Sequence, residues 1–256
     1  MFAIRKEQEA VLGAAAREHF ENEMMAHCQK FSPPLCATLE EPQLRLAIQY
    51  AIENAERYGL TTQGPVRLYI EMAMLFGSDF DSDPQYPWAK EILTNKELFI
   101  QSEKADQLFA KTLEYLDLVV GDDDVHTLKA LERISVYAQM TPAYSTDQYA
   151  SSMQDDIAML YPEKADYIGT TAIGSLIRKG EAKSIQYDMT SANDWVVVTI
   201  LMFCFGYHCE QDPFYPWIHN TFTDEKITDP EKRIKRLKKK AVTWLDQVIE
   251  WQTKGR

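Results

Sequence analysis

The sequence predicts an all-α protein made of two tandem, pseudo-equivalent helical repeats that pack as one body. Three observations lead to this fold class. Apolar residues recur at helical spacing, and no stretch alternates as a strand does. Glycine is scarce, with 10 in 256 residues, which favours helices over glycine-rich β architectures. A distinctive segment that ends at Trp88 returns 129 residues later and ends at Trp217.

The repeat keeps one register over a long stretch. FGSDFDSDPQYPW ends at Trp88, FGYHCEQDPFYPW ends at Trp217, and residues 16–121 align with residues 145–250 without a gap. A register kept over this length indicates an internal duplication. The expected organisation is a first copy over residues 1–121, a connecting helix and linker over residues 122–144, and a second copy over residues 145–256.

Each element is predicted from local signals. In the first copy, helices are expected over residues 40–58, from Thr61 or Thr62 to Phe76, from Pro87, and over residues 102–121. Gly59 and Gly77 end the first two of these helices. The connecting segment is expected to be helical over residues 126–140 and to break at Pro142. The second copy repeats the order, buries residues 195–205 in a helix, and ends on a helix over residues 229–251.

The loop shared by both copies carries acidic residues. Asp79, Asp81 and Asp83 occupy alternate positions, as at the start of an EF-hand calcium loop, but the glycine and the glutamate which that loop requires further on are missing. In the structural interpretation, Asp83 or Asp212 caps a helix whose first residue is the proline that follows it. In the functional interpretation, Asp79 and Asp81 contribute to a binding surface.

A second cluster offers ligands for a metal. Cys204, His208, Cys209 and His219 supply two thiols and two imidazoles, yet their spacing matches no standard zinc motif. Core thiols beside surface histidines explain them equally well. We expect no cofactor. A metal-dependent enzyme or metal-binding protein, which would use the Asp79–Asp83 loop or this cluster, remains the alternative function.

Two further features are candidate binding sites. Arg67 and Glu71 lie four residues apart on an otherwise apolar helix, where they either pair with each other or line a groove. The last helix carries eight basic and two acidic residues between positions 226 and 240, a local charge of +6 in a chain whose net charge is −12. The partner-binding candidates on that helix are Lys232, Arg233, Lys235, Arg236, Lys238 and Lys239.

The charge distribution bears on the class of partner. An acidic chain is a poor general binder of nucleic acid, because nonspecific affinity comes from basic residues that neutralise phosphates. The longest apolar run is too short to span a bilayer, and the first residues do not form a signal peptide, so we expect a cytoplasmic protein without membrane insertion. The basic face is either solvated or docks an acidic partner protein. Self-association through an apolar groove remains an alternative.

Residues 58–93, with the motifs ERYGLTTQGPV and RLYIEMAMLFGSDFDSDPQYPWAKEIL, resemble an uncharacterised family of bacterial proteins encoded beside toxin and effector genes of type VI secretion-like systems. The resemblance implies an accessory protein of a toxin module. Such a protein is either a chaperone or adaptor that loads the effector or an immunity protein that blocks it by direct binding. The family has no assigned catalytic residues, and we expect no enzymatic activity.

Overall fold

The structure is a computed structural model that describes residues 6–140 and 144–254. Within these residues every regular element is a helix, which confirms the predicted all-α class. The elements are α1 (Lys6–Phe31), α2 (Pro33–Cys36), α3 (Glu41–Arg57), α4 (Gln63–Phe76), α5 (Pro87–Thr94), α6 (Gln101–Tyr115), the π-helical turn η1 (Leu116–Val120), the 3₁₀ turn η2 (Asp122–Asp124), α7 (Val125–Gln139), α8 (Tyr149–Leu160), α9 (Pro162–Gln186), α10 (Ala192–Phe205), α11 (Pro216–Phe222) and α12 (Pro230–Lys254). None of them combines the length and the apolar composition that crossing a membrane requires.

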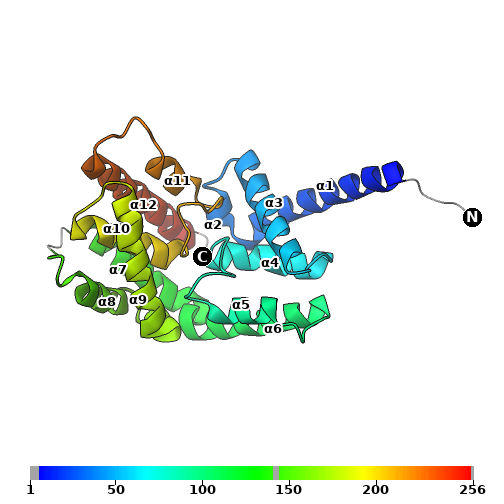
Figure 1. Ribbon diagram of the computed structural model, residues 1–256, viewed down its shortest axis with the longest axis horizontal. Coiled ribbons are helices and arrows are strands. Elements are labelled where there is room, and N and C mark those ends of the chain that lie inside the picture. Colours follow the sequence, from blue (N-terminus) through cyan, green and yellow to red (C-terminus); the bar gives the residue numbers. More distant parts are fainter. Residues whose placement is uncertain (1–5, 141–143, 255–256) are drawn as a thin grey trace, which may run out of the picture.

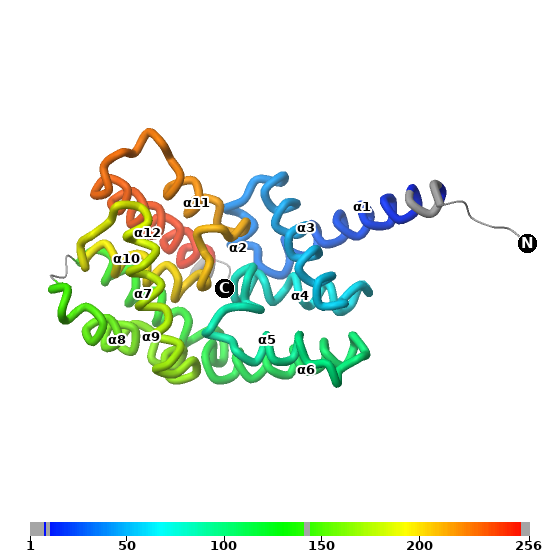
Figure 2. The backbone as a smooth tube through the Cα atoms, viewed as in Figure 1, coloured from blue at the N-terminus to red at the C-terminus, as the bar shows by residue number. Residues whose placement is uncertain are grey.

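The helices form two neighbouring groups, and α1 projects from one of them (Figure 1). Helices α3 to α6 lie together on one side of the molecule, α7 to α12 lie on the other, and α2 lies between the two groups. The backbone tube shows the chain passing from α6 into α7 between these groups (Figure 2). The elements from both groups therefore meet in the middle of the molecule.

Buried apolar side chains form one continuous core that runs from Met24 to Leu245. The α7 helix, which the sequence predicts as the connecting segment, packs against α12 and η1. This segment is thus an integral part of the packed body. Pro142, where the sequence predicts a break, lies outside the described residues.

Helix bounds in the two halves of the chain match at the offset of 129. Helices α4 and α10 begin and end 129 residues apart, and α6 and α12 begin 129 residues apart. Aromatic contacts match too: the ring centroids of Phe76 and Tyr115 are 4.9 Å apart, as are those of Phe205 and Trp244 at the corresponding positions. The two halves therefore share local geometry at these positions.

The halves meet most closely where α4 and α10 end. Gly77 and Gly206 follow these helices with φ angles of 99° and 102°. A Cβ atom on Gly77 would lie 2.8 Å from the carbonyl oxygen of Phe205, and one on Gly206 would lie 3.1 Å from that of Phe76. Glycine is required here because it combines a positive φ with this close approach of two backbones.

The capping role predicted for Asp83 and Asp212 is wrong. Helices α5 and α11 begin further on, at Pro87 and Pro216. Each aspartate carboxylate instead accepts a hydrogen bond from the backbone N–H two residues later, at 2.8 Å in both loops. The second proline of each loop is the first helical residue because its ring fixes φ and it has no N–H to leave unsatisfied.

Candidate functional site

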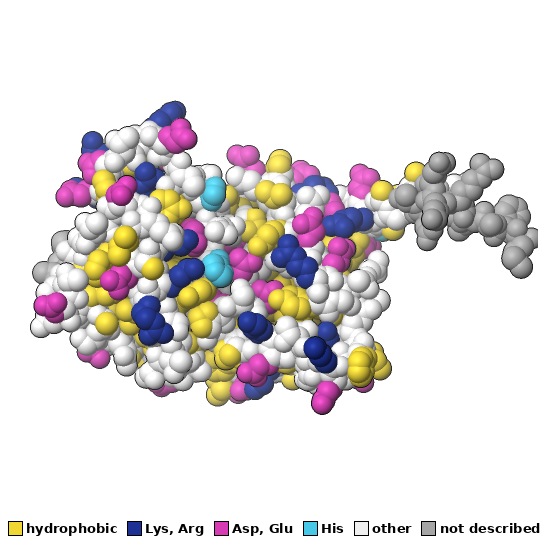
Figure 3. All heavy atoms as spheres, in the orientation of Figure 1, with side chains coloured by type: hydrophobic (Ala, Val, Ile, Leu, Met, Phe, Trp, Pro, Cys, Tyr) yellow, Lys and Arg dark blue, Asp and Glu magenta, His cyan; other side chains and the backbone are white. Residues whose placement is uncertain are grey.

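The loop that follows α4 packs against the loop that follows α10, and acidic and histidine side chains lie together in the middle of this face (Figure 3). Asp79 accepts a hydrogen bond from the hydroxyl of Tyr50 at 2.8 Å, and its other carboxylate oxygen lies 3.9 Å from Nδ1 of His208. Burial raises the pKa of Asp79, and Asp81 and Glu210 raise it further, while Tyr50 and His208 oppose the shift. Asp79 therefore has partners within the protein.

Asp81 is buried, with 8% of its surface exposed, and accepts a hydrogen bond from the hydroxyl of Tyr69 at 2.9 Å. At the corresponding position of the second half, Glu210 is also buried and forms an ion pair with Lys183, with 2.6 Å between Oε1 and Nζ. Both carboxylates are thus bonded inside the fold. Neither presents a surface to a partner.

The three ligands proposed for a metal face different surroundings. Cys204 lines a large cavity, His208 faces Asp79, and Nδ1 of His219 lies 3.1 Å from the carbonyl oxygen of Glu210. Burial raises the pKa of the Cys204 thiol to about 11, whereas metal binding requires the thiolate. Among the described residues, no group of three or more His, Cys, Asp or Glu side chains is arranged to hold a metal ion.

Arg67 and Glu71 form an ion pair along α4, with 2.9 Å between Nε and Oε1. The same oxygen of Glu71 lies 2.7 Å from Nε2 of His27 on α1. Arg67 is half exposed, whereas Glu71 is largely buried. Of the two interpretations of this pair, the structure thus shows the pairing, and it adds a histidine that ties α4 to α1.

Most of the basic residues of α12 point to solvent. We define the basic face of α12 as Lys232, Lys235, Arg236, Lys238 and Lys239. The side chains of Lys232 and Lys235 are each 77% exposed, and their ion pairs with acidic residues one turn earlier are long, at 4.0 and 3.9 Å. Arg236 pairs with Asp224 at 3.2 Å, and Nζ of Lys238 lies 3.4 Å from the carbonyl oxygen of Met140.

Arg233 has a different role from its neighbours. Its guanidinium donates hydrogen bonds to the backbone carbonyls of Thr221, Phe222 and Ile227, and so caps the end of α11. Lys104, at the corresponding position of the first half, donates to the carbonyl of Leu93 at 2.9 Å near the end of α5. Arg233 therefore belongs to the scaffold, and we leave it out of the basic face.

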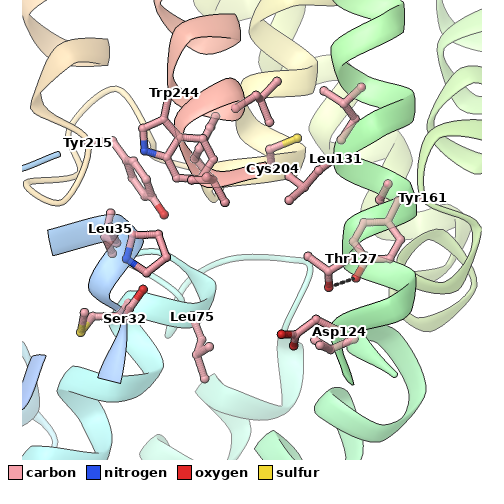
Figure 4. Close-up of a pocket in the computed structure, with 18 of the residues that line it drawn as sticks. Ser32, Leu35, Leu75, Asp124, Thr127, Leu131, Tyr161, Cys204, Tyr215 and Trp244 are labelled. Carbon is pink, nitrogen blue, oxygen red and sulfur yellow. Dashed lines mark hydrogen bonds between the residues drawn. The ribbon is translucent and has the colours of Figure 1, made fainter. Parts of the chain in front are cut away.

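The largest feature that the sequence did not predict is a cavity of about 600 Å³. It lies between α2, α4, α7, α10 and α12, where both halves meet (Figure 4). Its walls include pairs of residues 129 positions apart, one from each half: Ser32 and Tyr161, Leu35 and Lys164, Met74 and Phe203, Leu75 and Cys204, Tyr115 and Trp244, and Leu116 and Leu245. The cavity thus lies across the junction between the halves.

Lys164 is the unexpected residue in this lining. It is 5% exposed, and its ammonium donates to the carbonyl oxygen of Phe203 at 2.5 Å and lies 4.8 Å from the centre of the Phe203 ring. Burial lowers the pKa of Lys164, while Cys204 and Asp83 favour its charged form. Leu35 occupies the corresponding position in the first half and is equally buried. Comparing the two repeats would have singled out this lysine, because it replaces a core leucine.

Comparison with protein-family models, with curated proteins and with solved structures finds no match to this chain.

Proposed function

We propose that this chain is a non-catalytic helical module that binds an acidic partner protein through the basic face of α12. The observation that carries this proposal is the exposure of that face. Lys232 and Lys235 are mostly exposed and only loosely paired, and Lys239 is exposed and forms no ion pair with any described residue. Exposed charges of one sign speed association with a partner of opposite sign and select against partners of the same sign.

The two halves support a dedicated role for this face. We infer that they are copies of one helical unit, because helix bounds, aromatic contacts and glycine conformations match at an offset of 129. The basic face is found in the second half only. Lys232, Lys235 and Lys239 correspond to Glu103, Asp106 and Ala110 in the first half. The shared scaffold therefore requires none of these three lysines.

The sequence resemblance points to the class of partner. A module of this kind, encoded beside a secreted toxin, would act in the cytoplasm on that toxin or effector. It would do so as a chaperone or adaptor that loads the effector, or as an immunity protein that blocks it. In either role the mechanism is surface complementarity, with Lys232, Lys235, Arg236, Lys238 and Lys239 against carboxylates of the partner.

Co-expression with the product of the neighbouring gene, followed by size-exclusion chromatography, tests this function. We expect a complex that elutes ahead of either protein at low ionic strength. The complex should dissociate as salt is added, because salt screens exposed charges. Two proteins that elute separately at micromolar concentration and low salt would overturn the proposal. A complex whose stability is independent of salt would overturn the role of the basic face.

A further inference from the structure

We propose that the central cavity is a binding site for an aliphatic carboxylic acid, whose chain lies among the apolar walls and whose carboxylate meets the ammonium of Lys164. This inference is independent of the basic face of α12 and of any partner protein. The cavity volume of about 600 Å³ lies within the range of small-molecule sites. Ligand sites of that size are mostly apolar and carry a few polar groups that fix orientation.

The walls of the cavity fit an alkyl chain. Leu75 lies on one side and Leu131 on another, and Leu245 and Val248 contribute from α12. Figure 4 shows Leu35 and Leu75 facing the same space as Leu131. Transfer of each methylene group of a ligand from water to such surroundings is favourable by about 0.8 kcal/mol.

Lys164 supplies the charge complement. Among the described residues, no carboxylate lies within ion-pair distance of its ammonium. The carbonyl oxygen of Phe203, near the carboxyl end of α10, occupies one of its three donors and explains part of the stabilisation of the cation. A buried cation without an anion is costly. A ligand carboxylate would pair with it and accept the remaining donors.

Further polar groups lie in the same cavity. The hydroxyl of Tyr215 points into the space beside Trp244, and Cys204 lies next to them (Figure 4). The indole N–H of Trp244 is buried and has no hydrogen-bond partner. These groups can bond to a second ligand oxygen. A monoanion fits better than a phosphate dianion, because Asp124 lines the same cavity and would repel a second negative charge.

The test is a calorimetric titration of the full chain with decanoate and, in parallel, with 1-decanol. We expect decanoate to bind with one-to-one stoichiometry. Lys164→Met keeps the volume of the side chain and removes its charge, and should weaken decanoate binding about tenfold or more while changing decanol binding less than about twofold. Lys129→Met, at an exposed lysine outside the cavity, is the matched control and should change neither affinity.

A second measurement uses the wild-type chain alone, so that it stands even if Lys164→Met fails to fold. Burial raises the pKa of Cys204 and that of Cys36 to the same value, about 11, and both are partly exposed, but only Cys204 lines the cavity. Saturating decanoate should slow maleimide alkylation at Cys204 severalfold and leave Cys36 unchanged. Absence of decanoate binding, equal decanoate affinity of Lys164→Met and wild type, or unchanged alkylation of Cys204 would each overturn the proposal.

Discussion

Asp83 and Asp212, which lie 129 residues apart, make the same hydrogen bond into each other's half of the chain. The carboxylate of Asp83 accepts from the backbone N–H of Tyr207 at 2.8 Å, and that of Asp212 accepts from the backbone N–H of Ser78 at 2.8 Å. Both aspartates are buried. The two halves thus hold each other through one reciprocal pair of contacts, next to the close approach of the glycines.

Alanine at either aspartate should destabilise the fold. Asp83→Ala leaves the buried N–H of Tyr207 without its acceptor, and Asp212→Ala does the same to Ser78, at a cost of about 2–3 kcal/mol each. The double variant should lose less than the sum of the two, because both contacts close the same junction. Urea unfolding measures these differences, with Asp79→Ala as a partly exposed control. Strict additivity would contradict the reciprocal coupling.

The pH dependence of stability follows from Asp212. Burial raises the pKa of this carboxyl from its usual value of 3.8 to about 6. Between these values the folded chain holds a proton that the unfolded chain has lost, so this group lowers stability as pH rises through that window. The destabilisation by Asp212→Asn should therefore be larger at about pH 4.5 than at about pH 7, by about 1–2 kcal/mol. Urea midpoints of both proteins at each pH measure it, and an equal or smaller cost at the lower pH would contradict the shift.

Gly77 and Gly59 separate close approach from backbone strain. Both have a positive φ, but a Cβ atom would meet the carbonyl of Phe205 at Gly77 and nothing within 4 Å at Gly59. Gly59→Ala should cost about 1–2 kcal/mol from strain alone, and Gly77→Ala about 3 kcal/mol or more. Thermal and urea unfolding check the difference. Equal costs would mean that the junction relaxes to admit the methyl group.

Arg233 and Lys235 separate scaffold from surface on the same helix. Arg233→Met removes the donors that cap the end of α11 and should cost about 1–3 kcal/mol. Lys235→Met removes an exposed, loosely paired charge and should change stability by less than about 0.5 kcal/mol. Urea midpoints of the two variants provide the comparison. A neutral Arg233→Met variant would return this residue to the basic face.

Helix ends were predictable where a local signal sets them. Gly59 and Gly77 follow α3 and α4 as expected, and Pro87 begins α5, because left-handed glycines and a proline at the first helical position act on their own neighbours. The π-helical turn at residues 116–120 and the kink at Gly169 inside α9 were not predictable. Packing against other elements decides such irregularities, and a periodic pattern carries no trace of it.

The candidate site was predictable as a stripe but not residue by residue. Helical periodicity grouped Arg233 with the neighbouring basic residues, whereas its hydrogen bonds depend on the end of α11 lying nearby. The two repeats held a clue, since Arg233 corresponds to the basic Lys104 while Lys232 and Lys235 correspond to acids. In the same way, Lys164 stands where the first half has Leu35. Deviations between the repeats are therefore more informative than the helical pattern alone.

The binding affinity of charge-reversed chains for the product of the neighbouring gene tests the central claim most directly. We compare wild type with a triple variant that carries Lys232→Glu, Lys235→Glu and Lys239→Glu. The control triple variant, Lys90→Glu, Lys96→Glu and Lys129→Glu, changes the net charge equally at exposed lysines elsewhere. The account predicts that reversal on α12 weakens binding about a hundredfold and that the control weakens it less than about threefold. Equal losses in the two variants, or no loss in either, would contradict it.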